Sequence, residues 1–222
     1  NVIFSNIIIN DSNRGIGIFS RDDSDIRNIS FSNIFIETRL HSDGWWGKSE
    51  PIHISAIKSS TKGNPGIISD ISFNNINAFS ESGVVIYGEN INSIKNVKIS
   101  QITINNNILI PNSDGIHITS STNVNVSNSN IIAGDDALIV TGFKSGMEKY
   151  TFGNNSKEAK NIIFDNCIVT SKSSGIRVGY GEKPISNVIF SNIIINDSNR
   201  GIGVFSRDDS DIRNISFSNI FI

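Results

Sequence analysis

The chain contains few of the residues that build helices. Among its 222 residues, leucine occurs three times and alanine five times, whereas isoleucine occurs 44 times. Leucine and alanine favour helices, and β-branched residues such as isoleucine favour strands. This composition argues against an α-helical fold and favours a fold built of strands.

Cysteine, an excess of one charge and long apolar runs are also missing. The single cysteine, Cys167, excludes an internal disulfide and a metal site made of several cysteines. The 19 basic and 21 acidic residues leave a net charge of −2, which gives no electrostatic support for nucleic-acid binding. No apolar run approaches the roughly 18 residues that span a bilayer, and the three histidines lack metal-ligand spacing. We therefore expect no nucleic-acid or membrane partner, no metal and no cofactor.

A short phrase of the form Asn-hydrophobic-x-Phe-x-Asn recurs along the whole chain. Variants of it begin at residues 1, 28, 70, 96, 123, 161, 187 and 214, a spacing of 26 or 27 residues apart from two insertions, within 37–69 and 137–160. A repeat this short cannot bury its own apolar side, but stacked repeats can, as the coils of a solenoid. We predict one all-β domain over 1–222, a right-handed parallel β-helix of about eight coils. The recurrent asparagines are expected to form an internal ladder of hydrogen bonds.

A second, larger repeat is nearly perfect. Residues 1–36 return as residues 187–222 with one difference, Ile18 against Val204. Coil stacking does not require such identity, so two origins stay open: a window from a tandem array, or an engineered or recent duplication. We expect the two copies to share one backbone conformation. Since strand edges are expected at both ends, end-to-end self-association is a further expectation.

A shorter strand can be aligned in seven coils by a small residue followed by alternating hydrophobic residues. Alternation sends the hydrophobic side chains inward and the residue between them outward. The outward positions form one column along the solenoid: Gly17, His53, Val85, His117, Ile139, Arg177 and Gly203. The residues that open these strands form a second column, at a bend: Arg14, Glu50, Ser82, Asp114, Asp136, Ser174 and Arg200.

Two aspartates of the second column are predicted to be neighbours. Adjacent parallel strands lie about 4.8 Å apart, and Asp135 directly precedes Asp136, so Asp114, Asp135 and Asp136 should share one patch beside His117 and Arg177. Like charges this close raise one another's pKa, an arrangement suited to general acid–base chemistry. One aspartate in a turn indicates little, whereas three that converge on one face indicate a functional site.

At these residues the sequence resembles the polygalacturonase-like glycoside hydrolases of family 28. The family's paired Asn-Thr-Asp and Gly-Asp-Asp motifs are matched by residues 112–114 (Asn-Ser-Asp) and 134–136 (Gly-Asp-Asp). The resemblance implies inverting hydrolysis of a pectin-like polysaccharide that contains uronic acid. It makes Asp135 the general acid, while Asp114 and Asp136 hold and deprotonate the attacking water. We expect an extracellular or periplasmic location, although no signal peptide is visible.

Two motifs of that family are replaced in this chain. Its Gly-His-Gly segment is matched around Ser174, and its Arg-Ile-Lys segment by residues 203–205 (Gly-Val-Phe). In the family, the missing side chains help to position the bond and to grip the galacturonate carboxylate. Arg177 and Arg200 are candidate replacements, and Arg207 is a weaker one, because arginine binds carboxylates in a bidentate manner. His117, beside the aspartates, is a further candidate for binding the substrate.

The insertion within 37–69 carries both tryptophans of the chain. Trp45 and Trp46 lie in a polar, glycine-containing segment, where a core position is not expected. Aromatic faces pack on the apolar side of sugar rings, and Lys48 is suited to meet an acidic sugar. The alternative is that one tryptophan packs on a neighbouring coil.

Two classes of function stay open from the sequence. The first is a glycosidase of polygalacturonase type. The second is a structural β-solenoid, part of a fibre, filament or adhesin made of enzyme-like repeats, which the duplication and the replaced family motifs favour. The retained pair of aspartate motifs favours the enzyme, because a structural array has no need of three neighbouring carboxylates. A pectate lyase is a third interpretation, but no calcium site with an arginine base can be discerned.

Overall fold

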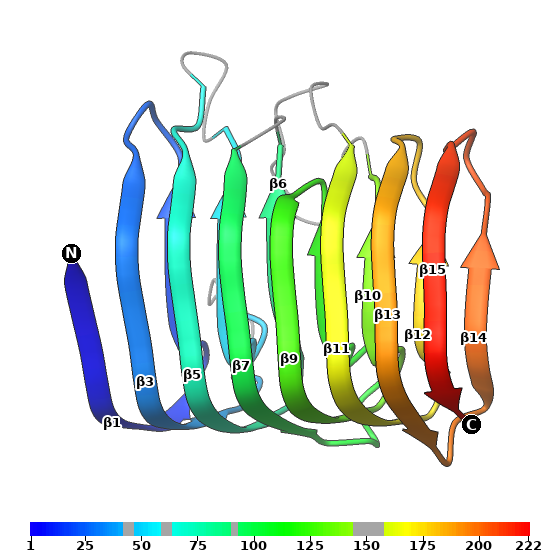
Figure 1. Cartoon of the computed structure of the whole chain (residues 1–222). Coiled ribbons are helices and arrows are strands. Elements are labelled where there is room, and N and C mark those ends of the chain that lie inside the picture. The colour runs from blue at the N-terminus through cyan, green and yellow to red at the C-terminus, as the bar shows by residue number, and fades with distance from the viewer. Residues whose placement is uncertain (42–46, 59–63, 90–92, 144–157) are drawn as a thin grey trace.

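The chain folds into a right-handed parallel β-helix, as the repeat predicts. The computed structural model describes residues 1–41, 47–58, 64–89, 93–143 and 158–222 (Figure 1). Each coil contributes a long strand and, in most coils, a short strand behind it. The long strands are β1 (Val2–Ser12), β3 (Ile26–Thr38), β5 (Ile68–Ser80), β7 (Ile94–Asn106), β9 (Thr122–Ala133), β11 (Ala159–Ser171), β13 (Ile185–Asn196) and β15 (Ile212–Phe221). The short strands are β2 (Ile16–Ser20), β4 (Ile52–Ala56), β6 (Val84–Gly88), β8 (Ile116–Thr119), β10 (Leu138–Thr141), β12 (Ser174–Gly179) and β14 (Arg200–Phe205).

Two parallel sheets result from this alternation. The long strands form an eight-stranded sheet and the short strands a seven-stranded sheet, each in the order of the chain. The predicted register of the short sheet is confirmed, since Ile116, Leu138, Ile176 and Ile202 lie opposite one another on consecutive coils. Equivalent residues of adjacent coils therefore lie about one strand spacing apart.

The recurring phenylalanine of the repeat points into the core and stacks from coil to coil. The rings are nearly parallel, with centroids 5.0–5.3 Å apart: Phe4, Phe31 and Phe73 at one end, and Phe164, Phe190 and Phe217 at the other. Between them the same column holds the buried side chains of Ile99 and Val126. The core is thus a set of columns of like residues, which explains why the phrase must recur in every coil.

The asparagine ladders form on the exposed surface, so the prediction of an internal ladder is wrong. The side-chain amide of Asn161 donates to Oδ1 of Asn123 at 3.0 Å and accepts from Nδ2 of Asn187 at 3.1 Å, all three being exposed. Each has a φ of 53–56°, in the left-handed region that asparagine tolerates better than most residues. Such a residue bends the strand and interrupts its inward–outward alternation. The amides therefore face outward, one above another.

The outward column of the short sheet has the predicted register, but its central side chains are not open to solvent. His117 and Arg177 are only 4% and 8% exposed. Ile139 lies between them and is completely buried, although it does not belong to the hydrophobic core inside the solenoid. Polar side chains of this column must therefore find partners within the protein.

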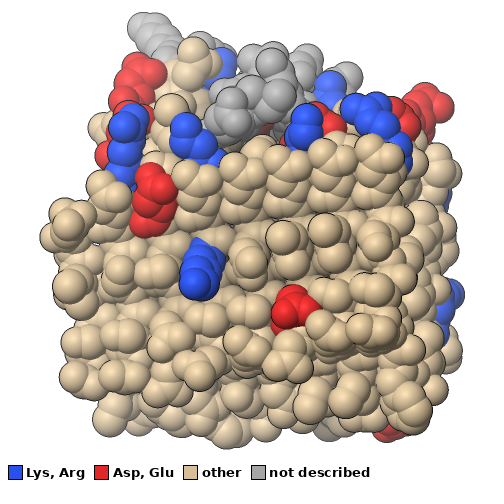
Figure 2. Space-filling view, viewed as in Figure 1, with Lys and Arg blue, Asp and Glu red and all other residues tan. Residues whose placement is uncertain are grey.

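The face of the long sheet carries little charge. Figure 2 shows it almost free of acidic and basic side chains, which gather along its upper edge. In the described part of the chain, no helix is long and apolar enough to cross a membrane.

The two sequence copies share backbone features but differ in their contacts. Left-handed φ values recur at corresponding positions, such as 56° at Asn33 and 52° at Asn219. Arg14 pairs with Glu50 on the following coil, whereas its counterpart Arg200 donates from Nη1 to Oγ of Ser174 on the preceding coil. The same local sequence thus meets two different surroundings.

Replacement of Asn161 tests the role of the ladder. In Asn161→Ala, two amide hydrogen bonds are lost, and alanine must keep a left-handed φ without a polar side chain to stabilise it. We therefore expect the free energy of unfolding to fall by about 1–2 kcal/mol. Asn161→Gly also loses the hydrogen bonds but relaxes the backbone, and should therefore be the more stable of the two variants. Urea unfolding followed by circular dichroism measures both. An alanine variant at least as stable as the glycine variant would contradict this explanation.

Candidate active site

A polar hollow of about 310 Å³ lies where the long strands turn into β8, β10, β12 and β14. Its walls come from the turns of consecutive coils and from the outer side of the short sheet. Three aspartates, two arginines and three other polar residues line it: Asp114, Asp135, Asp136, Arg177, Arg200, Asn112, Ser173 and Tyr180. All three predicted catalytic residues and both predicted arginines therefore meet in one place.

The backbone of two adjacent turns brings the carboxylates together. The amide of Gly115 donates to the carbonyl oxygen of Asp136 at 2.8 Å, which fixes the coil that carries Asp114 on the coil that carries Asp136. A Cβ at position 115 would collide with the carbonyl oxygen of Ala137, so only glycine permits this approach. One carboxylate oxygen from each aspartate lies within 4.8 Å of those of the other two. Hard cations such as Ca²⁺ bind carboxylate oxygens of this kind, although Arg177 already lies against Asp136.

Asp136 is the most enclosed of the three aspartates. It is 6% exposed, its Oδ1 accepts a hydrogen bond of 2.9 Å from the amide of Ser174, and its Oδ2 lies 2.5 Å from Nε of Arg177. Both oxygens are therefore engaged by the protein. Leaving either partner out would leave a charged group buried and unpaired, so the three groups form one structural unit.

Asp135 is the carboxyl group that the site pushes toward its protonated form. Partial burial raises its pKa, and the charges of Asp114 and Asp136 raise it further. A hydrogen bond from Ser173 and the charge of Arg177 oppose this shift without cancelling it. The hollow thus combines one carboxyl group biased toward the acid with neighbouring carboxylates, which is the basis of paired acid–base chemistry.

Asp114 is partly exposed and has one oxygen engaged. Its Oδ2 lies 2.8 Å from Nδ1 of His117, and its side chain is 23% exposed. Among the described residues, no partner contacts its Oδ1. His117 itself is not open to a ligand, because it is buried and its Nε2 lies 2.9 Å from Oγ1 of Thr141.

The two arginines of the hollow, Arg177 and Arg200, differ in their partners. The Arg177 guanidinium pairs with Asp136 and lies over the ring of Tyr180, with its Cζ 4.6 Å from the ring centroid. Arg200 donates to the hydroxyl of Ser174 and lies over the ring of Phe205. It has no carboxylate partner in the described part of the chain. Arg200 is therefore the cation of the hollow that remains available to an anionic group.

Tyr180 was not among the predicted site residues. Its ring lies between the guanidinium groups of Arg177 and Arg207, with both Cζ atoms within 4.7 Å of its centroid. Its φ of 65° follows that of Gly179 (120°) and precedes that of Gly181 (95°), so an unusual turn presents the ring. The signal in the sequence was a tyrosine between two glycines. Asn112 and Ser173 were also missed as lining residues, although Asn112 belongs to the matched aspartate motif.

Only part of the predicted aromatic loop lies among the described residues. Trp45 and Trp46 lie outside the described residues. Lys48 is exposed and adjoins β4, two strands away from β8 in the short sheet, and it does not line the hollow.

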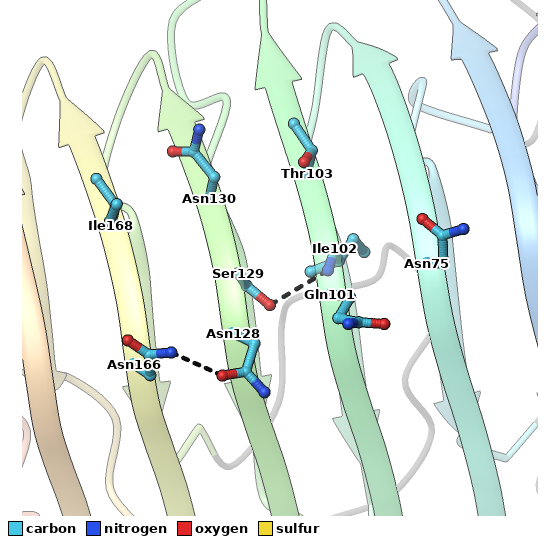
Figure 3. Close-up of a pocket in the computed structure, with 9 residues that line it drawn as sticks. All are labelled: Asn75, Gln101, Ile102, Thr103, Asn128, Ser129, Asn130, Asn166 and Ile168. Atoms are coloured by element: carbon cyan, nitrogen blue, oxygen red, sulfur yellow. Dashed lines mark hydrogen bonds between the residues drawn. The ribbon is translucent and has the colours of Figure 1, made fainter.

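A second, wider hollow lies on the long sheet. It measures about 600 Å³ and is lined by amide, hydroxyl and isoleucine side chains from β5, β7, β9 and β11 (Figure 3). None of its lining residues carries a group able to donate or accept a proton near neutral pH. Acid–base chemistry therefore belongs to the smaller hollow.

The sequence model described as glycosyl hydrolases family 28 matches residues 85–222. The match covers all three aspartates, together with Arg177 and Arg200. The chain belongs to this family. A polygalacturonase from Nicotiana tabacum is 27% identical over 104 residues, which make up 40% of this chain and 26% of that protein. The chain thus spans about a quarter of the length of this curated relative.

The raised pKa of Asp135 predicts a gain in stability when its charge is removed. In the folded state the charged form is disfavoured, so the contribution of Asp135 to stability falls as the pH rises above the ordinary aspartate pKa of 3.8. Asp135→Asn should therefore have a higher Tm than the wild type at pH 7, and the difference should shrink toward pH 3. Thermal unfolding followed by circular dichroism measures both.

Asp165→Asn provides a control of opposite sign. Hydrogen bonds from Ser191 and Asn192 lower the pKa of Asp165, so its charge stabilises the folded state above the ordinary pKa. This variant should have a lower Tm at pH 7. A decrease in both variants would show that Asp135 is not destabilised by its surroundings.

Proposed function

We propose that the hollow hydrolyses glycosidic bonds in a pectin-like polysaccharide that contains uronic acid. The observation that carries the proposal is the convergence of three carboxyl groups, one with a raised pKa, on adjacent coils. Glycoside hydrolysis requires a protonated carboxyl group and a carboxylate at the same bond. Membership in family 28 and the similarity to a polygalacturonase support the same reaction.

Asp135 acts as the general acid. Its surroundings favour the protonated form, since burial and the charges of Asp114 and Asp136 raise its pKa. In the reaction, this proton passes to the glycosidic oxygen as the bond to the anomeric carbon breaks. The sugar of the leaving part thereby departs as a neutral alcohol.

Asp114 acts as the general base, and Asp136 holds the arrangement around it. Asp114 has a partly exposed side chain and an oxygen without a partner among the described residues, so it can accept a proton from water. Both oxygens of Asp136 are engaged by Ser174 and Arg177, so neither is left to contact the attacking water. Its charge raises the pKa of Asp135, and it fixes the arginine beside the substrate.

The attack of water in a single displacement would invert the anomeric configuration. A retaining enzyme instead needs a carboxylate that attacks the sugar, and the enclosed Asp136 is unsuited to this role. The 4.8 Å span of the three oxygens is shorter than the roughly 6.5–9.5 Å between carboxyl groups that is usual for inversion. The stereochemistry of the product is therefore the decisive test of this part of the proposal.

Arg200 recognises the uronic-acid carboxylate. It lines the hollow, its hydrogen-bonding partner is the neutral Ser174, and its guanidinium keeps further N–H groups for a bidentate contact. Arg177 is less suited, because Asp136 already neutralises it. An enzyme that acts on plant cell-wall polymers works outside the cell, which agrees with the expected extracellular or periplasmic location.

The structural solenoid is not favoured as an alternative. A fibre or adhesin gains nothing from the repulsion among three carboxylates, which costs stability. End-to-end self-association through the outer edges of β1 and β15 stays a prediction that is independent of the catalytic proposal.

Asp135→Asn is expected to abolish the cleavage of polygalacturonic acid. The amide retains the shape of the side chain but carries no acidic proton, so kcat should fall at least about 10²–10⁴-fold. A reducing-sugar assay measures this, and Asp165→Asn is the control, since it removes a carboxylate on the outer face of β11. NMR of fresh wild-type product should show the inverted anomer. A retained anomer would contradict the single displacement, and an active Asp135→Asn variant would contradict the assignment of the acid.

Arg200→Gln is expected to weaken the binding of charged substrate. A hydrogen-bonded contact with a charged group is worth about 1.5–3 kcal/mol, so KM for de-esterified polygalacturonate should rise about 10–100-fold. For the fully methyl-esterified polymer, which lacks this charge, KM should change little. An equal rise for both polymers would show that Arg200 does not read the carboxylate.

A further inference from the structure

A chain of hydrogen bonds leads from the hollow into the protein behind Asp114. Nδ1 of His117 lies 2.8 Å from Oδ2 of Asp114, and Nε2 of the same ring lies 2.9 Å from Oγ1 of Thr141. Oγ1 of Thr141 lies 2.7 Å from Oγ1 of Thr119. His117, Thr119 and Thr141 are all nearly or fully buried. The imidazole is thus held at both nitrogens and cannot turn away from Asp114.

We infer that His117 is the positioning residue of the general base: its Nδ1–H holds Oδ2 of Asp114 so that Oδ1 is left to take a proton from water. The inference rests on the proposed function, in which Asp114 is the base. A carboxylate accepts hydrogen bonds only, so Nδ1 must be the donor in this contact. In the neutral ring, Nε2 is then an acceptor and takes the hydrogen bond of the Thr141 hydroxyl. The carboxylate of Asp114 therefore selects the tautomer, and the hydroxyl of Thr141 complements it at Nε2.

The β4 coil contains a matched pair that lacks the catalytic features. His53 lies opposite Gly17 and Val85 in the same outward column, and its Nδ1 lies 3.0 Å from Oε1 of Glu50, again three residues earlier. Glu50, however, also accepts two hydrogen bonds from Arg14 and one from the amide of Lys48.

The two pairs also differ in exposure. The Glu50 side chain is 6% exposed, against 23% for Asp114. The pair on β4 is therefore a closed ion-pair network, whereas the pair on β8 leaves one carboxylate oxygen open at the hollow. The strand gives both pairs the same contact between the histidine and a carboxylate three residues earlier. The residues around each carboxylate decide whether it is closed or open to the hollow.

Two substitutions separate the two contacts of the ring. In His117→Asn, the side-chain amide nitrogen takes the place of Nδ1 and can still donate to Asp114. In His117→Gln, the amide reaches the place of Nε2 and Thr141, but no donor remains for Asp114. We expect His117→Asn to keep kcat on polygalacturonic acid within about tenfold of the wild type, while His117→Gln loses about 10–100-fold in kcat with KM nearly unchanged.

His53→Asn and His53→Gln are the matched controls. They change the same residue type in the same column, and both should leave kcat and KM as in the wild type. Thermal unfolding confirms that each variant is folded. Equal kcat for the two His117 variants, or an effect confined to KM, would overturn the positioning role.

A second readout does not depend on turnover. Nitrogen NMR of ¹⁵N-histidine-labelled wild-type protein should show Nδ1 of His117 protonated, and the His117 variants assign the signal. An unprotonated Nδ1 would overturn the inference. The wild type could also show a protonated Nδ1 of His117 but cleave no uronic-acid polymer. That result would reject the proposed function and still support the hydrogen bond between His117 and Asp114.

Discussion

Everything in this molecule depends on the register between coils. Parallel strands fix each residue opposite its counterpart, so that like residues form columns about one strand spacing apart. In the core, the columns are phenylalanine and isoleucine, and the contact between them is favourable. In the turns before β8 and β10, the same spacing brings aspartates together, and the contact between them is repulsive. The stability of the core columns is what holds the carboxyl groups at this distance.

The sequence contained the register because the repeat is regular. The recurring phenylalanine and the alternation in the short strands were sufficient to place Asp114 beside Asp136 and Arg177 on the next coil, as the structure shows. Features that depend on the sign of the backbone φ angle could not be predicted from the repeat. The asparagines adopt a left-handed φ, which turns the ladder outward, and Tyr180 adopts one between two glycines. Strand alternation alone assigns neither side chain correctly.

Burial was the other quantity that alternation could not supply. Alternation predicted outward positions for His117 and Arg177, and the structure shows both side chains buried. Both residues were expected to contact a substrate, and both instead contact an aspartate of the site. Their chemistry was recognised correctly, but the partner of each lies within the protein. Arg200, on the next coil, is left as the cation that a substrate can reach.

The three aspartates of the site thus differ in their surroundings, although their side chains are the same. Asp136 is enclosed by Arg177 and Ser174, and Asp114 is held by His117. Asp135 lies near the charges of both other aspartates, and Arg177 offsets them only in part. The most direct test is a ¹³C-NMR titration of the Asp135 carboxyl group in the wild type, in Asp114→Asn and in Asp136→Asn. The account predicts a pKa above the ordinary 3.8 in the wild type and a lower pKa in each variant. A wild-type pKa at or below the ordinary value would contradict it.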